Sequence, residues 1–378
     1  MCGILRSAHV PVGNQTIIFS TFNFQLSTLK TAIVILNWNG RHMLERFLPS
    51  VTACCPADAE VIIADNGSTD DSIAFLKEHY PTLRLILLDR NYGFAGGYNR
   101  ALEQVDANYF VLLNDDVEVT PGWVDAVEAE MERDPQVAIA QPKLLMFDQK
   151  DTFEYAGGAG GFIDKYGYPF CRGRLFSTLE KDNGQYNDCR EIFWASGAAM
   201  FVKSKVWREM GGLDDDFFAH MEEIDFCWRC KNRGYKVIYC PDSVVYHVGG
   251  GTLPKSSPFK TQLNFRNNLS MLYKNLPSNR LCRVLALRIF LDWVAALSFL
   301  AKGNAGEFKA VFKAHKEYRT WKPSLKQKRA ALFNNGNTAP SSRDSSTHPT
   351  EVSCIYNGYL LLDYHLLHRK HFSQLPIL

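Results

Sequence analysis

The chain lacks the features that mark several common classes of protein. Its 378 residues carry a formal net charge of only +2, which gives no overall electrostatic reason to expect nucleic-acid binding. Its ten cysteines show no disulfide framework, and the single C-x-x-C, from Cys227 to Cys230, has no second pair to complete a zinc site. We therefore expect reduced thiols, a cytoplasmic location and no nucleic-acid partner.

Long uninterrupted apolar runs are also missing. Residues 281–300 are apolar, but they include Arg283, Arg288 and Asp292 and fall short of the roughly twenty residues that a membrane span needs. An amphipathic helix at a membrane interface, or a helix packed on the body, fits this segment better. The Lys-rich segment 302–328 could lie against anionic lipid or form a solvated helical face. We predict amphipathic helices over 276–330, with peripheral contact to the inner face of the cell membrane.

Both ends of the chain lack a clear pattern. Residues 1–29 have no sustained apolar core, which argues against a signal peptide and predicts a poorly ordered extension. Residues 333–350 are rich in Asn, Ser, Thr and Pro, a composition typical of disorder. We therefore predict a disordered tail over 331–378.

What the chain does contain is a series of short apolar runs separated by segments of helical spacing. The runs at 32–36, 60–64, 83–88 and 110–113 have the composition of buried strands. Strands that alternate with helices at this spacing predict a parallel α/β sheet that binds a nucleotide. Residues 150–188 have weak periodicity and are interpreted as a long insertion or a flexible region over the sheet.

Two groups of carboxylates stand out along the chain. Asp115 and Asp116 follow the apolar run 110–113, and adjacent buried carboxylates repel unless a hard divalent cation binds them. The alternative is a solvated junction between a strand and a turn. Glu222 and Glu223 begin a predicted helix, where acidic side chains can also serve simply to stabilise the helix N-terminus.

Five stretches in a fixed order then carry a family resemblance. They are residues 35–40 (ILNWNG), 64–70 (ADNGSTD), 91–99 (NYGFAGGYN), 113–116 (LNDD) and 217–229, with Val245-Tyr246-His247 in support. Over about residues 31–275 the sequence resembles family 2 inverting glycosyltransferases with the GT-A fold, and most of all the bacterial rhamnosyltransferase-like members. The resemblance implies a single Rossmann-like α/β domain over 30–275 with a mixed central sheet.

The resemblance also implies where the sugar donor binds. Asp116 would hold a divalent cation, Mg²⁺ or Mn²⁺, that bridges the diphosphate of a nucleotide-sugar, and His247 resembles a second ligand found in some members. A lone histidine is more often structural than a ligand. The remaining donor-binding candidates are Asn37, Asn39, Asp65, Asn91, Gly96, Asn114 and Asp115.

The catalytic base of the family corresponds here to Glu223, with Asp225 as the second candidate. The base would deprotonate an acceptor hydroxyl, which attacks the anomeric carbon in line and inverts its configuration. Trp194, Ser196 and Glu222 would shape the acceptor side. These roles predict transfer of a sugar, with rhamnose as the first candidate, to a glycan or lipid-linked acceptor in cell-surface polysaccharide synthesis.

Two other functions share this sheet. A non-catalytic protein that binds nucleotide-sugars or carbohydrates could have the same fold, but both acidic clusters are intact, which argues against it. A nucleotidyltransferase would normally carry a Gly-rich, basic loop after the first strand, whereas residues 37–40 lead only to Arg41.

Overall fold

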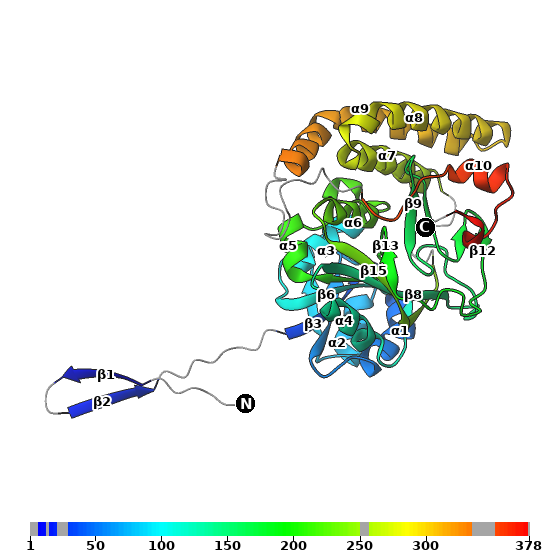
Figure 1. Cartoon of the computed structure of the whole chain (residues 1–378). Coiled ribbons are helices and arrows are strands. Elements are labelled where there is room, and N and C mark those ends of the chain that lie inside the picture. Colours follow the sequence, from blue (N-terminus) through cyan, green and yellow to red (C-terminus); the bar gives the residue numbers. More distant parts are fainter. Residues whose placement is uncertain (1–6, 13–14, 21–28, 250–256, 335–351, 377–378) are drawn as a thin grey trace.

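A mixed sheet forms the centre of the fold (Figure 1). The computed structural model describes residues 7–12, 15–20, 29–249, 257–334 and 352–376. One half of the sheet is parallel, in the order β6, β3, β4, β5. These strands are β3 (Leu29–Asn37), β4 (Ala59–Asp65), β5 (Arg84–Leu87) and β6 (Ala107–Asn114). They confirm the four strands predicted from the apolar runs.

The other half of the sheet contains antiparallel pairs. β14 (Ala199–Lys203) runs antiparallel to both β6 and β8 (Val137–Met146). β15 (Lys236–His247) pairs in parallel with β8, and the short strands β13 (Arg190–Ile192) and β7 (Val117–Val119) pair antiparallel to β15. The predicted mixed central sheet is thereby confirmed.

Alternate residues of each central strand face opposite sides of the sheet, because side chains alternate along a strand. In β3, Ala32 and Val34 pack into one core cluster, while Ile33 and Ile35 pack into another. The first cluster is covered by α3 (Gly93–Leu102), α5 (Ser204–Met210) and α6 (Glu222–Asn232). The second is covered by α1 (Arg41–Ala53), α2 (Ser72–His79) and α4 (Trp123–Arg133).

The insertion over 150–188 forms most of a second, five-stranded sheet. Its strands lie in the order β12, β11, β10, β9, β16. Their bounds are β9 (Gly161–Asp164), β10 (Pro169–Cys171), β11 (Arg174–Leu175), β12 (Thr178–Leu179) and β16 (Ile355–Tyr356).

The prediction of a disordered tail over 331–378 is wrong for residues 352–376. β16 pairs in parallel with β9, and α10 (Leu360–His365) and a 3₁₀ turn (Phe372–Gln374) follow it. Tyr356, Leu360, Tyr364, Phe372 and Leu375 are buried in the main core cluster. These apolar side chains fill the open side of the second sheet, and that burial orders the segment. Residues 335–351 lie outside the described part.

Three long helices follow the central sheet. α7 (Pro258–Asn275) begins at Ser257, whose hydroxyl accepts a hydrogen bond from the Lys260 N–H, with Pro258 in the first turn. α8 (Ser278–Ala301) and α9 (Ala305–Asn334) confirm the helices predicted over 276–330. Both lie on the outer side of α7 (Figure 1).

The N-terminal extension is described only in part. Residues Ser7–Val12 and Gln15–Ser20 pair as an antiparallel hairpin, and Leu29 already belongs to β3. The other residues of the predicted extension lie outside the described part.

Candidate active site

The central acidic motif lies at the carboxyl end of β6. Asn114 ends the strand, and its N–H donates to the carbonyl of Ala198 on the loop before β14 (3.0 Å). Asp116 is buried, and its Oδ1 lies 3.1 Å from Nε2 of His247 at the end of β15. The pairing of β7 with β15 sets this approach, because Val117 is opposite His247 in the register. The structure therefore brings together the two predicted metal ligands.

The charges of this pair perturb both groups. Burial alone would raise the pKa of Asp116, but the neighbouring His247 holds it below its ordinary value. Burial alone would lower the pKa of His247, but Asp116 and Glu154 raise it well above its ordinary value. Glu154 is buried, with Oε1 3.4 Å from Nδ1 of His247. No sequence motif marks Glu154, which lies in the weakly patterned insertion.

The residues present fit a divalent cation held by two protein ligands once His247 gives up the proton that Asp116 stabilises on its ring. Neighbouring ligands on an octahedral ion at about 2.1 Å lie about 3 Å apart, close to the separation of Asp116 Oδ1 and His247 Nε2. Within the described residues there is no cluster of three or more His, Cys, Asp or Glu side chains arranged for a metal. A cation here would need its other ligands from substrate phosphates and water, as magnesium sites commonly do.

Asp115 lies against the loop that follows β3. A Cβ atom added to Gly40 would come within 2.2 Å of Asp115 Oδ2, so only glycine permits this approach. Burial and the charge of Asp116 raise the pKa of Asp115 to about 7. Ionisation of this carboxylate therefore costs more than it would in water, and a cation bound nearby would reduce that cost.

The predicted donor-binding residues of β3 and β4 lie at the same sheet edge. Asp65 accepts hydrogen bonds from Asn37 Nδ2 (2.8 Å) and from the Ser68 N–H (2.9 Å). Asn39, at φ 54°, accepts from the Thr69 N–H through its Oδ1 (2.7 Å). These bonds join the two strand-end loops into one surface, and the contacts of these residues with a donor stay a prediction.

The glycine-rich motif begins α3 beside the second acidic cluster. Asn91 Oδ1 accepts from the Gly93 N–H (2.7 Å), and Gly93 has φ 72°. The Phe218 carbonyl accepts from the N–H groups of Phe94 (2.7 Å) and Ala95 (3.2 Å). Gly96 lies nearby, where an added Cβ would approach Asp215 at 3.7 Å. Two motifs that are far apart in sequence therefore meet at the start of α3.

The turn before α6 is strained. Phe218, His220 and Met221 all have positive φ (65°, 70° and 73°), a conformation that costs roughly 1 to 3 kcal/mol at each non-glycine residue. Asn267 of α7 holds the turn, because its Nδ2 lies within 2.9 Å of the carbonyl oxygens of Phe217, Ala219 and His220. Strain that is fixed in this way is common at functional sites. The amide-rich composition of this helix is visible in the sequence, but its target is not.

The strained turn presents Glu222 and Glu223 at the start of α6. Each has a buried Oε2 without a hydrogen-bond partner. Burial raises the pKa of Glu223 to about 7, and burial together with Glu223 raises the pKa of Glu222 well above its ordinary value. Both Glu223 and Glu154 act on the thiol of Cys171, whose pKa is raised to about 11, first by burial. Glu223 and Glu154, which contacts His247, are therefore both within electrostatic range of the same thiol.

The assignment of Asp225 as a second catalytic candidate is wrong. Its side chain is fully buried, and its oxygens accept from Arg229 Nε (2.9 Å), Lys274 Nζ (2.8 Å) and Asn275 Nδ2 (2.8 Å). A carboxylate with two cationic partners and no exposure joins α6 to α7 and cannot contact an acceptor.

Trp194 and Ser196 are buried as well. Trp194 donates from Nε1 to the Phe162 carbonyl (2.9 Å), and its ring lies where a side chain at Gly161 would be. The Ser196 N–H donates to Gln141 Oε1 (2.9 Å). Neither residue presents a free polar group, so neither offers a polar contact to an acceptor, contrary to the prediction.

Comparison with known proteins identifies the family. The model of "Glycosyl transferase family 2" matches residues 32–181, and that of "Glycosyl transferase family group 2" matches residues 109–257. The chain thus contains a domain that matches glycosyl transferase family 2. It is accordingly a glycosyltransferase of an inverting family that uses nucleotide-sugar donors.

Individual relatives of this family 2 chain are distant. An N-acetylglucosaminyl-diphospho-decaprenol L-rhamnosyltransferase from Mycobacterium tuberculosis is 27% identical over 231 residues, covering 57% of this chain and 75% of the relative. A dTDP-rhamnosyl transferase from Shigella flexneri is 23% identical over 259 residues, covering 64% of this chain and 79% of the relative. The fold is similar to that of GalNAc-T7 solved with UDP, GalNAc and Mn²⁺ (TM-score 0.52, 17% identity), with 65% of this chain covered and about half (49%) of GalNAc-T7.

Proposed function

We propose that this family 2 enzyme transfers L-rhamnose from a nucleotide-diphosphate donor to a hydroxyl group of a lipid-linked saccharide. The names of the two rhamnosyltransferase relatives support the sugar, and the decaprenol-linked substrate in the first name supports the class of acceptor. The product would be an intermediate in the synthesis of a cell-surface polysaccharide.

In this proposal the donor's diphosphate lies beside Asp116 and His247. These side chains would hold a divalent cation, which when bound offsets the negative charge that develops on the nucleoside diphosphate leaving group. Asp115 and the loops after β3 and β4 orient the nucleotide and sugar along the carboxyl edge of the sheet.

Glu223 is the proposed catalytic base. The observation that carries this assignment is its buried, unpartnered Oε2 on a strained turn, with a pKa raised to about 7. A base with a pKa near the working pH is half ionised there and still takes a proton well. Glu223 removes the proton from the acceptor hydroxyl while the oxygen of that hydroxyl bonds to the anomeric carbon. The nucleoside diphosphate leaves from the opposite face of the sugar, so the anomeric configuration is inverted.

The test is a panel of donors with purified full-length protein. dTDP-rhamnose, UDP-sugars and GDP-sugars are supplied with Mn²⁺ and a short-chain polyprenyl diphosphate saccharide, and release of nucleoside diphosphate is measured. We expect acceptor-dependent release with dTDP-rhamnose. If only a different donor supports release, the assignment of rhamnose as the transferred sugar is wrong. If no donor binds or turns over, the proposed function is wrong.

A cytoplasmic location at the inner face of the membrane remains a prediction. Soluble nucleotide-sugar donors are consistent with that side. Fractionation of cells that express the chain at its natural level tests it, with recovery in the cytosol and inner-membrane fractions expected.

A further inference from the structure

α8 has its polarity reversed relative to an ordinary surface helix. The stripe that faces the body, at spacings of four residues, carries Val284, Arg288, Asp292 and Ala296, all buried. The outward stripe carries Phe290 (63% exposed), Val294 (50%), Leu297 (59%) and Leu300 (46%). A solvated helix normally places charge outward and apolar side chains inward. An apolar row this long on the outside indicates contact with an apolar phase or surface.

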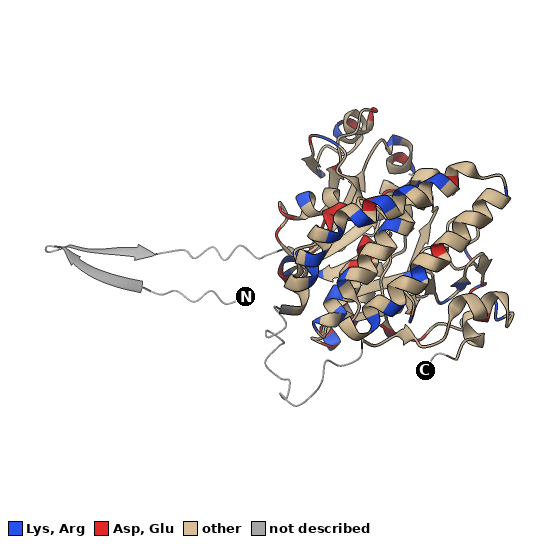
Figure 2. Cartoon of the chain, turned by 90° about the horizontal axis from the view of Figure 1, so that it is seen from above, with Lys and Arg blue, Asp and Glu red and all other residues tan. Residues whose placement is uncertain are grey.

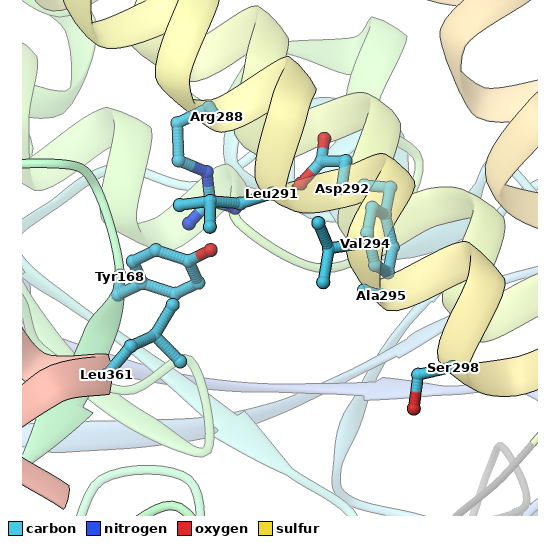
Figure 3. A pocket seen from close by; sticks show the side chains of 9 residues that line it. Tyr168, Arg288, Leu291, Asp292, Val294, Ala295, Ser298 and Leu361 are labelled. Atoms are coloured by element: carbon cyan, nitrogen blue, oxygen red, sulfur yellow. Dashed lines mark ion pairs between the residues drawn. The ribbon is translucent and has the colours of Figure 1, made fainter. Parts of the chain in front are cut away.

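The inward charges of α8 have ionic and aromatic partners within the protein, while Nε and Nη1 of Arg288 are buried without a hydrogen-bond partner. Arg288 lies over the ring of Tyr168, with its Cζ 3.6 Å from the ring centroid, and pairs with Asp292 at 3.7 Å. Asp292 in turn lies 3.1 Å from His315 Nε2 of α9. Figure 3 shows Arg288 above Tyr168, with Leu361 of α10 facing the same recess. These contacts fix which face of α8 points inward.

The outward face of the neighbouring helix α9 is basic. Lys309, Lys313, Lys316, Arg319, Lys322 and Lys326 are all exposed. Segment 276–334 contains 12 Lys and Arg against 3 Asp and Glu, a formal charge of +9, although the whole chain carries only +2. Figure 2 looks at the molecule from above these helices and shows the blue basic positions along the helices of this side. Such a local excess complements an anionic surface.

The surface formed by the exposed side chains of α8 and α9 continues onto α10. Leu361 lines a cavity of about 260 Å³ together with Leu291, Val294 and Ala295 of α8. Leu362 of α10 (47%) and the following Leu366 (68%) and Leu367 (56%) are exposed. Apolar side chains from α8 and α10, basic side chains from α9 and an apolar recess therefore occur together.

We propose that this α8–α9 surface docks on a lipid bilayer that contains anionic lipid. The apolar row of α8 enters the interface between headgroups and acyl chains, and the lysines of α9 lie against the headgroups. The proposal goes beyond the glycosyltransferase function and does not depend on catalysis. It does fit an acceptor that is anchored in a membrane.

α8 is long and apolar enough to cross a membrane by length and composition, and within the described residues it is the one helix that is. Two features favour an interfacial position over a span. Crossing would bring the Arg288–Asp292–His315 cluster into the hydrocarbon, at a considerable cost. Only Lys302 to Asn304 separate α8 from α9, so the lysines of α9 would have to follow α8 into the bilayer.

The experiment is flotation of the full-length protein with vesicles, first of phosphatidylcholine alone and then with about a third phosphatidylglycerol. We expect binding to the anionic vesicles that falls as salt rises. Lys309→Glu/Lys316→Glu is expected to lower the partition constant more than about tenfold, because each basic residue near the surface contributes roughly 1 kcal/mol. The matched control, Lys77→Glu/Lys205→Glu, makes the same charge change on exposed residues of α2 and α5 and should retain at least half of the binding.

The apolar row is tested separately with Phe290→Ser/Leu297→Ser. This variant should bind anionic vesicles at least fivefold less than Leu87→Ser, which removes an exposed leucine from β5, and both should have the same nucleotide release with a water-soluble acceptor. Equal vesicle binding by all four variants and the wild type would overturn the proposal. A second result would also overturn it: light scattering shows that the wild type is a dimer, and Phe290→Ser/Leu297→Ser is a monomer that binds vesicles as well as the wild type. A second copy of the chain, and not a bilayer, would then cover α8.

Discussion

Replacing Glu223 by Gln should remove activity and stabilise the protein at once. Gln keeps the shape of the protonated side chain, but it cannot accept the acceptor's proton or become charged. General bases typically contribute 10²- to 10⁴-fold, so we expect kcat to fall by about that factor. Nucleotide-donor binding should persist, because the predicted donor contacts lie at the edge of the sheet and not on α6.

The stability effect follows from the pKa of Glu223. Burial raises this pKa from its ordinary value of 4.5 to about 7. Between these values the folded protein binds more protons than the unfolded chain, so the wild type loses stability as pH rises through this window. The difference is at most about 3.5 kcal/mol, reached above pH 7, since each tenfold change in acidity corresponds to about 1.4 kcal/mol. Glu222 titrates nearby and shares part of this effect.

The assay is thermal unfolding of wild type and Glu223→Gln across pH 4 to 9, beside the rate of nucleoside diphosphate release. The two melting temperatures should coincide near pH 4.5, diverge between about pH 4.5 and 7, and stay apart above pH 7, with the variant higher by on the order of 5 °C. The wild-type kcat/KM should rise with pH and level off above about 7. Glu78→Gln, an exposed change on α2, serves as the control. A variant that retains transfer, or that melts below the wild type at pH 8, would refute the reasoning.

Further predictions concern the other parts of the site. Asp116→Asn should weaken Mn²⁺-dependent binding of nucleoside diphosphate at least about tenfold, as calorimetry with and without the metal would reveal, while metal-free binding stays unchanged. Asp225→Asn should lower the free energy of unfolding by roughly 1.5 to 3 kcal/mol in urea, because Arg229 and Lys274 lose a charged hydrogen-bond partner while Lys274 keeps Asp214; equal stability would contradict the buried ion pair. Asn267→Ala should lower kcat more than donor affinity, since it frees the strained turn, and an unchanged kcat would count against that support. Deletion of 352–378 should lower the melting temperature by exposing the second sheet, whereas an unaltered melting curve would show that the segment adds nothing to the fold.

Much of the central fold could be predicted from the sequence. The strands of the parallel half are continuous apolar runs such as residues 32–36, buried on both faces, so the pattern is strong and the strand ends are sharp. The polar residues after those ends, among them Asp65 and Asp116, then fall at one edge of the sheet by topology alone. The placement of these residues at one edge could therefore be predicted, whereas the burial of Trp194, Ser196 and Asp225 could not.

The packing of the insertion (150–188) and of the tail (352–376) could not be predicted from such patterns. Glu154 approaches His247 only because residues 150–188 fold back over the sheet, and nothing local in that segment indicates its partner. The tail contributes scattered side chains such as Tyr356 and Phe372 to a sheet that is itself built from two- to four-residue strands. Composition suggested disorder at 333–350, but composition cannot tell where a disordered-looking stretch ends and a docked one begins.

Helical geometry could have distinguished Glu223, which has no cationic partner on its own helix, from Asp225, which is ion-paired. Two residues along an α-helix are about 200° apart around its axis, so these carboxylates cannot both face an acceptor. Asp225 is four residues before Arg229, a spacing that forms an ion pair on one helical face, and the structure contains that pair at 2.9 Å. Glu223 has no cation at that spacing, since residue 227 is Cys. A carboxylate whose own helix offers no cation is the one whose burial raises its pKa, and a raised pKa is what a base near neutral pH requires. On this argument Glu223→Asp, which keeps the charge but shortens the reach by one methylene, should retain more activity than Glu223→Gln at pH 8.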